Sequence, residues 1–307
     1  MKVLFLNEGD RKKHYSRIER DFFLKLGDLC HLSVYDLDCS YYDKRIGAGE
    51  LERLFRPDLV LVLYTYYMRV GKGRFLYNHF IDKFRVPVVV VEVEHHKFPD
   101  RDNWYRKHGV DLVLFRGAVE KCSVPSAWLP FSANEQEFSL GDNSRSDKIL
   151  FVGSDGVGNS DYKLRRDALR LLDKNKLLYK ADGLQGRDYA EILKQFKCGF
   201  ACGLGELHTL IAKVFEMMAC GCVVLDQKIK YDEILFGNKK CYFTYRDDLS
   251  DLVDIVRFVL NNDVSEIRNN AYEIVSKFHT DRVRIMELYE ILTSFLYKGE
   301  IYKPWGM

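Results

Sequence analysis

The sequence predicts an α/β fold made of two Rossmann-like domains, each a doubly wound parallel sheet covered by helices. Short apolar runs rich in β-branched residues alternate with longer amphipathic stretches along the chain, and this alternation is typical of βαβ units. A polar, turn-rich segment, LGDNSRSD at 140–147, divides the pattern into two similar halves. The length of 307 residues also fits two domains of average size.

The first half, residues 1–140, carries five apolar runs of the kind found in strands buried on both faces. The expected strands cover residues 3–6, 32–35, 59–63, 86–91 and 112–115. Amphipathic patterns between them predict helices at 15–26, 73–84 and 103–108. We therefore expect an N-terminal domain at 1–140, followed by a linker at 141–147.

The second half repeats this rhythm and predicts a second domain at 148–280. Its strands are expected at 149–152, 177–180, 199–202 and 222–225. Its helices are expected at 164–172, 188–195, 209–219, 249–260 and 264–278, with a last helix at 281–296 and an aromatic tail at 297–305. Ligands of such sheets bind at the carboxyl ends of the strands, so the expected site is a central cleft that the two domains face.

The composition excludes several classes of protein. Lys and Arg number 47 against 45 Asp and Glu, so the chain is not a strongly basic coat for nucleic acid. The N-terminal apolar run is too short for a signal peptide, and the longest apolar runs fall well short of a membrane span. We expect a cytoplasmic protein with no integral membrane segment.

Eight cysteines occur without any Cys-x-x-Cys pair. Cys198, Cys202, Cys220 and Cys222 would be enough thiolates for a zinc site. Their apolar, strand-like surroundings favour buried free thiols instead, so no metal site is predicted.

The most informative segment is GLGELHTLIAKVFEMMACGCVVL at 203–225. A glycine-rich turn leads into a helix with Lys213 and Glu216, then Ala-Cys-Gly and an apolar strand. This resembles the nucleotide-sugar signature of GT-B glycosyltransferases of the "glycosyl transferases group 1" set, closest to the branch of spore-maturation proteins. FVGS at 151–154, LPFSAN at 129–134, YAEIL at 189–193 and FHTDR at 278–282 resemble further family segments, and together they cover roughly residues 125–295.

The resemblance implies a GT-B fold whose last helix crosses back to the first domain, so that residues 281–307 pack there. The alternative for the aromatic tail is a helix at a membrane interface. It also implies a glycosyltransferase, a hexosyl- or pentosyltransferase, that moves a sugar from a nucleoside-diphosphate sugar, UDP- or GDP-linked, to an acceptor hydroxyl. The family needs no metal and usually retains the anomeric configuration.

Donor-binding residues follow from the same motif. A carboxylate such as Glu216 can accept hydrogen bonds from both ribose hydroxyls, and a helix N-terminus with nearby cations can hold a diphosphate. The expected donor-binding residues are Gly153, Arg165, Arg166, Gly205, Glu206, His208, Thr209, Lys213 and Glu216. His208 stands where many group 1 enzymes carry the first Glu of Glu-x7-Glu. His208 could contact the sugar or the leaving phosphate, Glu206 could substitute for that Glu, or His208 could be structural.

The acceptor is expected at loops after the strands of the first half. Glu94, His95 and His96 follow a buried strand, where a general base or an acceptor clamp would sit, and with His208 they are the catalytic candidates. Acceptor binding is expected from Glu8, Arg11, Tyr66 and Arg69.

Two other functions remain open. A glycan is the expected acceptor, but basic residues in two of these loops also fit a DNA acceptor, as in viral enzymes that glycosylate hydroxylated DNA bases. Such a protein would work in the cytoplasm of a host cell. The histidine in place of Glu also fits an inactive module that only binds nucleotide sugar.

Overall fold

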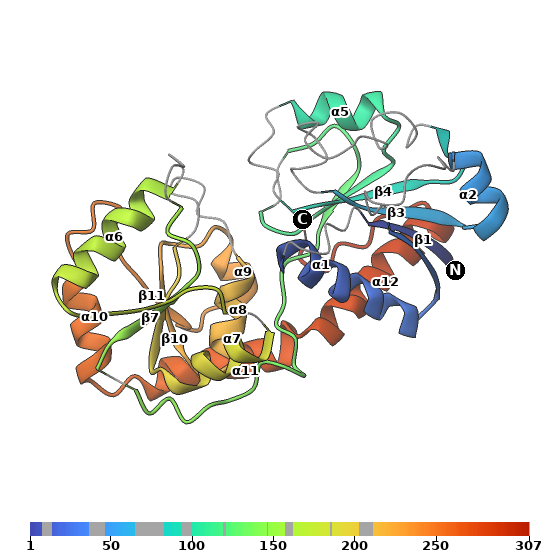
Figure 1. The fold of residues 1–307 in the computed structure, drawn as a ribbon. Coiled ribbons are helices and arrows are strands. Elements are labelled where there is room, and N and C mark those ends of the chain that lie inside the picture. Colours follow the sequence, from blue (N-terminus) through green and yellow to red (C-terminus); the bar gives the residue numbers. More distant parts are fainter. Residues whose placement is uncertain are drawn as a thin grey trace. The chain divides into compact units, whose positions relative to one another are not determined.

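The computed structural model describes residues 1–7, 14–36, 47–64, 83–93, 100–118, 121–145, 147–156, 162–184, 186–202 and 211–306. They form two compact units. Unit 1 combines Met1–Pro130 with Ile285–Met307, and unit 2 is Phe131–Arg284. Each unit is a parallel sheet with helices packed on it (Figure 1). The helix expected at 73–84 falls almost entirely outside the described residues.

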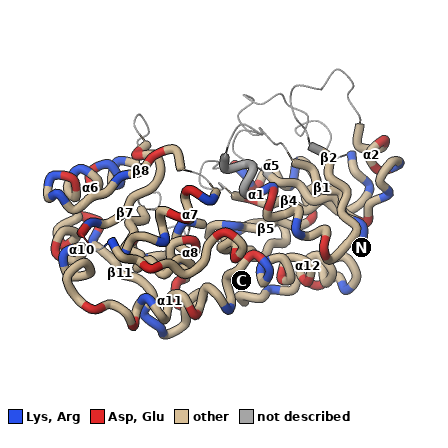
Figure 2. Tube along the Cα trace, turned by 60° about the horizontal axis from the view of Figure 1, so that its bottom comes forward, with Lys and Arg blue, Asp and Glu red and all other residues tan. Residues whose placement is uncertain are grey.

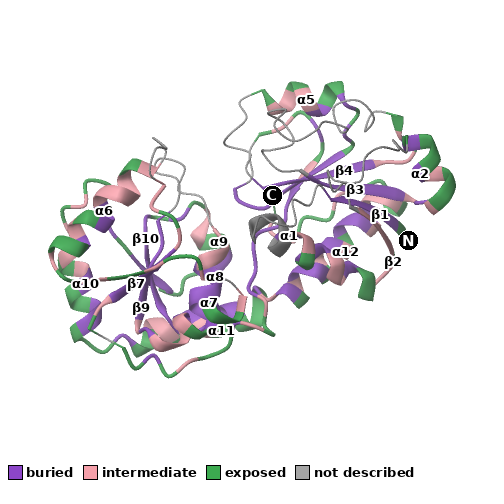
Figure 3. Cartoon of the chain, in the orientation of Figure 1, coloured by how far each residue is buried: buried purple, intermediate pink, exposed green. Residues whose placement is uncertain are grey.

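Unit 1 contains a six-stranded sheet in the order β2-β1-β3-β4-β5-β6, and every neighbouring pair is parallel. The strands are β1 (Lys2–Asn7), β2 (His31–Asp36), β3 (Leu59–Tyr64), β4 (Val88–Glu92), β5 (Leu112–Phe115) and β6 (Ser126–Trp128). Among the described residues before the second unit, the helices are α1 (His14–Leu24), the 3-10 helix η1 (Lys25–Asp28), α2 (Ala48–Phe55) and α5 (Arg101–Lys107). The inner strands are buried (Figure 3), as their uninterrupted apolar sequences predict.

The C-terminal helix α12 (Asp281–Lys298) begins in unit 2 and continues into unit 1, as expected. Its Leu288 and Ile291 are fully buried. Beyond the helix, the Trp305 ring meets the Trp128 ring edge to face, with centroids 6.2 Å apart. Trp305 Nε1 also donates a hydrogen bond to Glu287. The aromatic tail therefore packs within unit 1.

Unit 2 contains a five-stranded sheet in the order β11-β10-β9-β7-β8, again with parallel neighbours. The strands are β7 (Ile149–Val152), β8 (Leu178–Ala181), β9 (Cys198–Phe200), β10 (Val223–Asp226) and β11 (Tyr242–Thr244). The helices are α6 (Lys163–Lys174), α7 (Gly186–Gln195), α8 (Ala212–Ala219), α9 (Asp232–Phe236), α10 (Leu252–Asn261) and α11 (Ser265–Phe278). Apolar side chains of α6 and α10 form the core with one face of this sheet, and α8 packs against α11.

The helix expected at 209–219 begins later than predicted. Ile211 has an extended backbone, with φ of −121° and ψ of 154°, and the helix starts at Ala212. An apolar pattern marks the buried face of a helix but not its first residue, which depends on the backbone before it.

The expected linker at 141–147 is held against unit 2 by its backbone. Gly141 N donates to Cys220 O, Asn143 N to Lys194 O, and Arg145 N to Gln195 O, at 2.8–3.1 Å. The chain passes from unit 1 to unit 2 earlier, between Pro130 and Phe131. Polar composition therefore marked a surface segment of unit 2, since backbone pairing needs no apolar side chains.

The charged residues in the described part of the chain do not separate by sign. Basic and acidic residues are interspersed along both units (Figure 2). In the described part of the chain, no helix combines the length and apolar character needed to cross a membrane.

Candidate functional site

The candidate site lies where the strands of unit 2 end. Of the sequence-predicted site residues, the structure describes Gly153, Arg165, Arg166, Lys213 and Glu216. The others fall outside the described residues: Glu8, Arg11, Tyr66, Arg69, Glu94, His95, His96, Gly205, Glu206, His208 and Thr209. The described site residues therefore all belong to the predicted donor-binding set.

Lys213 connects the first turn of α8 to the end of β7. Its ammonium Nζ donates a hydrogen bond of 2.5 Å to the Val152 carbonyl and lies 5.6 Å from the centroid of the Phe151 ring. Loss of water around the ammonium, followed by repulsion from Arg165, lowers the pKa of Lys213 to about 8, although Glu216 opposes the shift. At neutral pH the side chain remains a cation, held in one place beside the strand end.

Gly153 makes room for this lysine. Its φ of +120° is a backbone conformation that side-chain-bearing residues rarely adopt. A Cβ at this position would lie only 2.5 Å from Lys213 Nζ. Glycine is therefore required both by the backbone and by the position of the ammonium.

Glu216 is the buried carboxyl of the site. It lies one turn after Lys213 on α8, and only 6% of it is exposed. Burial raises the pKa of Glu216 to about 7, while Lys213 and the hydroxyl of Tyr189 lower it and Asp281 and Glu137 raise it slightly. A ligand that donates hydrogen bonds to the carboxylate would favour its ionised form.

Arg165 connects two strand ends of the sheet. Its guanidinium donates to the Cys202 carbonyl after β9, through Nε at 3.2 Å and Nη2 at 2.5 Å. Nη1 donates to the Ser154 carbonyl after β7 at 3.1 Å. The guanidinium also stacks on Tyr162, 4.3 Å from the ring centroid. Arg165 thus places a rigid positive charge near Lys213 and braces the two loops.

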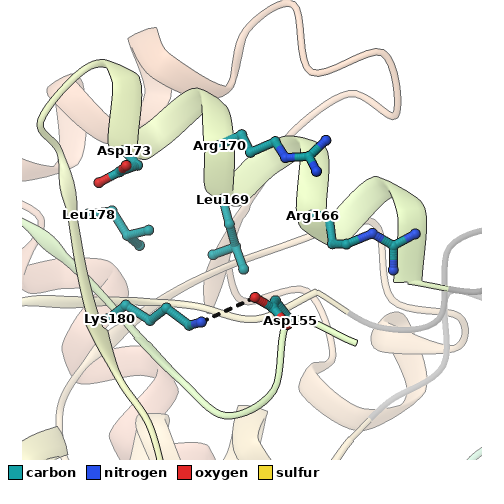
Figure 4. A pocket seen from close by; sticks show the side chains of 7 residues that line it. All are labelled: Asp155, Arg166, Leu169, Arg170, Asp173, Leu178 and Lys180. Atoms are coloured by element: carbon teal, nitrogen blue, oxygen red, sulfur yellow. Dashed lines mark hydrogen bonds and ion pairs between the residues drawn. The ribbon is translucent and has the colours of Figure 1, made fainter. Parts of the chain in front are cut away.

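Arg166 lies elsewhere. It donates to the Gly156 carbonyl at 2.6 Å and lines an open pocket of about 300 Å³ between α6 and β8 (Figure 4). The other lining residues are Asp155, Leu169, Arg170, Asp173, Leu178 and Lys180. Lys180 pairs with Asp155 at 3.2 Å, so part of the pocket's charge is already compensated within the protein.

Tyr189 is a neighbour of Glu216 that the sequence did not indicate. The residue appeared only within the YAEIL segment, but its side chain on α7 is buried next to Glu216. The available signal was a polar tip on the apolar face of an amphipathic helix, since a buried hydroxyl calls for a partner.

Unit 1 also carries buried polar groups at its strand ends that the sequence reasoning did not single out. Glu92 ends β4 and accepts a hydrogen bond of 2.6 Å from the Tyr105 hydroxyl. Arg116 follows β5 and pairs with Glu19 at 3.1 Å, with both side chains almost inaccessible. Both residues stand directly after an all-apolar run in the sequence, and this position could have marked them as candidates for a buried polar contact.

The buried cysteines remain thiols. Cys198, Cys202, Cys220 and Cys222 are buried and unbridged, and burial raises the pKa of each. Zinc would require thiolates. Among the residues that the structure describes, no group of three or more His, Cys, Asp or Glu side chains is arranged to hold a metal ion.

A family model described as "Glycosyl transferase-like" matches residues 153–290. No curated protein matches the sequence.

Several solved structures share the fold over nearly the whole chain. Sucrose-phosphate synthase of Thermosynechococcus elongatus has a TM-score of 0.65 at 11% identity, covering 98% of this chain and 100% of its own. The DNA-modifying enzyme β-glucosyltransferase was solved with and without uridine diphosphoglucose. It has a TM-score of 0.65 at 14% identity, and the match covers 96% of this chain and 99% of the enzyme. HepE of Anabaena, in complex with UDP and glucose, has a TM-score of 0.61 at 13% identity, and the match covers 96% of this chain and 100% of HepE. At these identities the likeness establishes the fold.

Proposed function

We propose that the protein, which has the GT-B fold, is a glycosyltransferase that transfers a sugar from a nucleoside-diphosphate sugar to an acceptor hydroxyl, as its sequence predicts. The observation that carries the proposal is the arrangement of Gly153, Lys213 and Glu216 at the strand ends of unit 2. These residues lie within the part of the chain that matches the family model.

Each residue has a proposed role in holding the donor. Lys213 neutralises charge that develops on the leaving diphosphate, and the nearby Arg165 supports it. Glu216 accepts hydrogen bonds from the two ribose hydroxyls, which only the ionised carboxylate can do for both. The glycine at 153 lets the diphosphate approach the backbone closely.

A uridine nucleotide is the favoured donor, because β-glucosyltransferase and HepE were solved with UDP-containing ligands. A GDP-sugar is the alternative. We propose that transfer needs no metal, since fixed cations supply the charge, and that it retains the anomeric configuration. The β-glucosyltransferase of T4 phage was also solved with UDP and Mn²⁺, so the metal requirement must be measured directly.

The proposed acceptor-binding residues come from the sequence, because they lie outside the described residues. We propose that Glu8, Arg11, Tyr66 and Arg69 contact the acceptor. Glu94, His95, His96 and His208 remain the candidates for proton transfer. A hydroxylated DNA base is a second candidate acceptor, because an enzyme that modifies DNA shares the fold.

Donor binding tests the proposal. Calorimetry with a panel of nucleoside diphosphates and their sugars is expected to find one that binds the wild-type protein and binds Glu216→Gln at least about tenfold more weakly, since two hydrogen bonds to a charge are lost. Glu191→Gln on α7 is the matched control, because that carboxylate is exposed and pairs only with a neighbouring lysine among the described contacts. If no member of the panel binds the wild type, the proposal fails.

Acceptor use is tested next with the donor so identified. Release of the nucleoside diphosphate is measured with glycans and with duplex DNA carrying hydroxymethylated bases. Acceleration by DNA alone would establish the second candidate. Donor binding without transfer to any acceptor or to water would indicate a binding module.

A further inference from the structure

The hydroxyl group of Tyr189 is buried, and among the described residues it has no hydrogen-bond partner in good geometry. The residue is only 6% exposed, and its ring packs edge to face on Phe138 with centroids 5.8 Å apart. Within the described part of the chain, its Oη is buried and reaches hydrogen-bond geometry with no other group. A buried hydroxyl in that state is less favourable than a satisfied one, so such groups need an explanation.

The groups that face this hydroxyl point to Glu216. Besides burial, Glu216 raises the pKa of Tyr189 most, and Cys220 and Cys222 follow. The two cysteines remain neutral thiols, because burial raises the pKa of both, and a thiol is a weak acceptor. The Glu216 carboxyl is therefore the one strong acceptor among these neighbours.

The carboxyl in turn has few groups that favour its charge. The groups that act on Glu216 are Lys213 and Tyr189, which favour ionisation, and Asp281 and Glu137, which oppose it. Lys213 donates to the Val152 carbonyl, so its position is set by the strand end. Tyr189 approaches the carboxyl from α7, a different helix, and its hydroxyl favours the ionised form.

We propose that Tyr189 is a positioning residue for Glu216: its hydroxyl donates a hydrogen bond to the Glu216 carboxylate and holds it in the orientation that receives the donor's ribose hydroxyls. The inference rests on the proposed function for the ribose. The interaction of the two side chains, however, is a property of the protein without ligand and is measurable separately.

The first experiment measures the ionisation of Glu216 without any ligand. Infrared difference spectra follow the carboxylic acid band as pH rises, and Glu216→Gln identifies which band belongs to this residue. In Tyr189→Phe the midpoint of the Glu216 titration is expected to rise by about half to one pH unit, because one hydrogen bond to the charged form is lost. An unchanged midpoint in a folded variant overturns the proposal.

Tyr245→Phe is the matched control. Tyr245 is also buried, lies in unit 2, and has a hydroxyl with no partner within hydrogen-bond geometry among the described residues. Its removal should leave the Glu216 midpoint where it is. Tyr189→Met removes the same hydroxyl while keeping apolar volume, and it serves as the second variant if Tyr189→Phe does not fold.

The second experiment connects the pair to the donor. Affinity for UDP-glucose is measured from pH 6 to 8.5 in the wild type and Tyr189→Phe. The wild type is expected to bind about three- to tenfold more tightly at the acidic end, and the ratio should shrink toward the alkaline end, where Glu216 is ionised in both and only the loss of orientation remains. An equal loss at every pH would mean that Tyr189 only fills space, which overturns the inference. If no nucleotide sugar binds the wild type, the proposed function fails while the infrared result still decides the interaction of Tyr189 with Glu216.

Discussion

Replacing Glu216 by Gln should stabilise the ligand-free protein at neutral and alkaline pH, although it removes the proposed ribose contact. Burial raises the pKa of Glu216 to about 7, so the folded protein holds this proton more tightly than the unfolded chain does. Between the carboxyl's ordinary pKa and about 7, rising pH deprotonates the unfolded chain first, and the stability of the wild type falls. Glutamine has the same shape and no proton to lose.

The magnitude follows from the size of the shift. Each pKa unit corresponds to 1.36 kcal/mol, which gives an upper limit of about 3 kcal/mol above pH 7. Glutamine also loses the attraction to Lys213, one turn earlier on α8. We therefore expect the free energy of unfolding of Glu216→Gln to exceed that of wild type by about 1–2 kcal/mol at pH 8, with little difference at pH 5.

Urea denaturation at pH 5, 6, 7 and 8 measures this difference. Circular dichroism follows both units, whereas tryptophan fluorescence follows unit 1, because all three tryptophans of the chain lie there. The part of the circular dichroism transition that fluorescence does not follow therefore belongs to unit 2. The exposed Glu191→Gln should show no such pH dependence. A difference between wild type and Glu216→Gln that stays constant with pH would refute the desolvation argument, as would a less stable variant at pH 8.

Three further changes test other parts of the structure. Gly153→Ala should lower the free energy of unfolding by about 1–3 kcal/mol and displace Lys213, whereas Gly183→Ala, also at positive φ but with open space around it, should lower it less; equal thermal shifts would contradict the reasoning. Arg116→Met should destabilise unit 1 by about 3–5 kcal/mol, because Glu19 stays buried without its cation, and a fluorescence-detected urea midpoint unchanged from wild type would disprove this. Chelation with EDTA should leave the transfer rate within twofold, and a larger loss that Mn²⁺ restores would show that a metal takes part.

The sequence predicted the fold where strands are buried on both faces. β1, β3, β4 and β5 are uninterrupted apolar runs, and such runs have few other stable environments in a soluble α/β protein. The elements that escaped prediction are short. β6, β11, η1, α9 and α2 have 3, 3, 4, 5 and 8 residues, so their patterns carry too little periodicity to stand out. These short elements form because neighbouring strands and helices pair with them and pack on them.

The residues of the candidate site also fall into those that the sequence indicated and those that it did not. Lys213 and Glu216 were predictable because their positions belong to a local motif on one helix. Tyr189 was not, because its proximity to Glu216 depends on how α7 and α8 pack, and spacing along the chain does not contain that packing. The separation of Arg166 from Arg165 has a similar origin: adjacent residues on a helix point in different directions.

The two units treat their buried ionisable groups differently, and this difference argues for the donor site in unit 2. In unit 1, Arg116 meets Glu19, and Glu92 accepts from Tyr105, so these charges are compensated within the protein. In unit 2, burial holds the Glu216 carboxyl near neutrality and removes water from the Lys213 ammonium. Unfavourable features gathered at one edge of a sheet persist when they serve a ligand that relieves them. A nucleotide sugar would do so, because its hydroxyls donate to the carboxylate while its diphosphate pairs with the nearby cations.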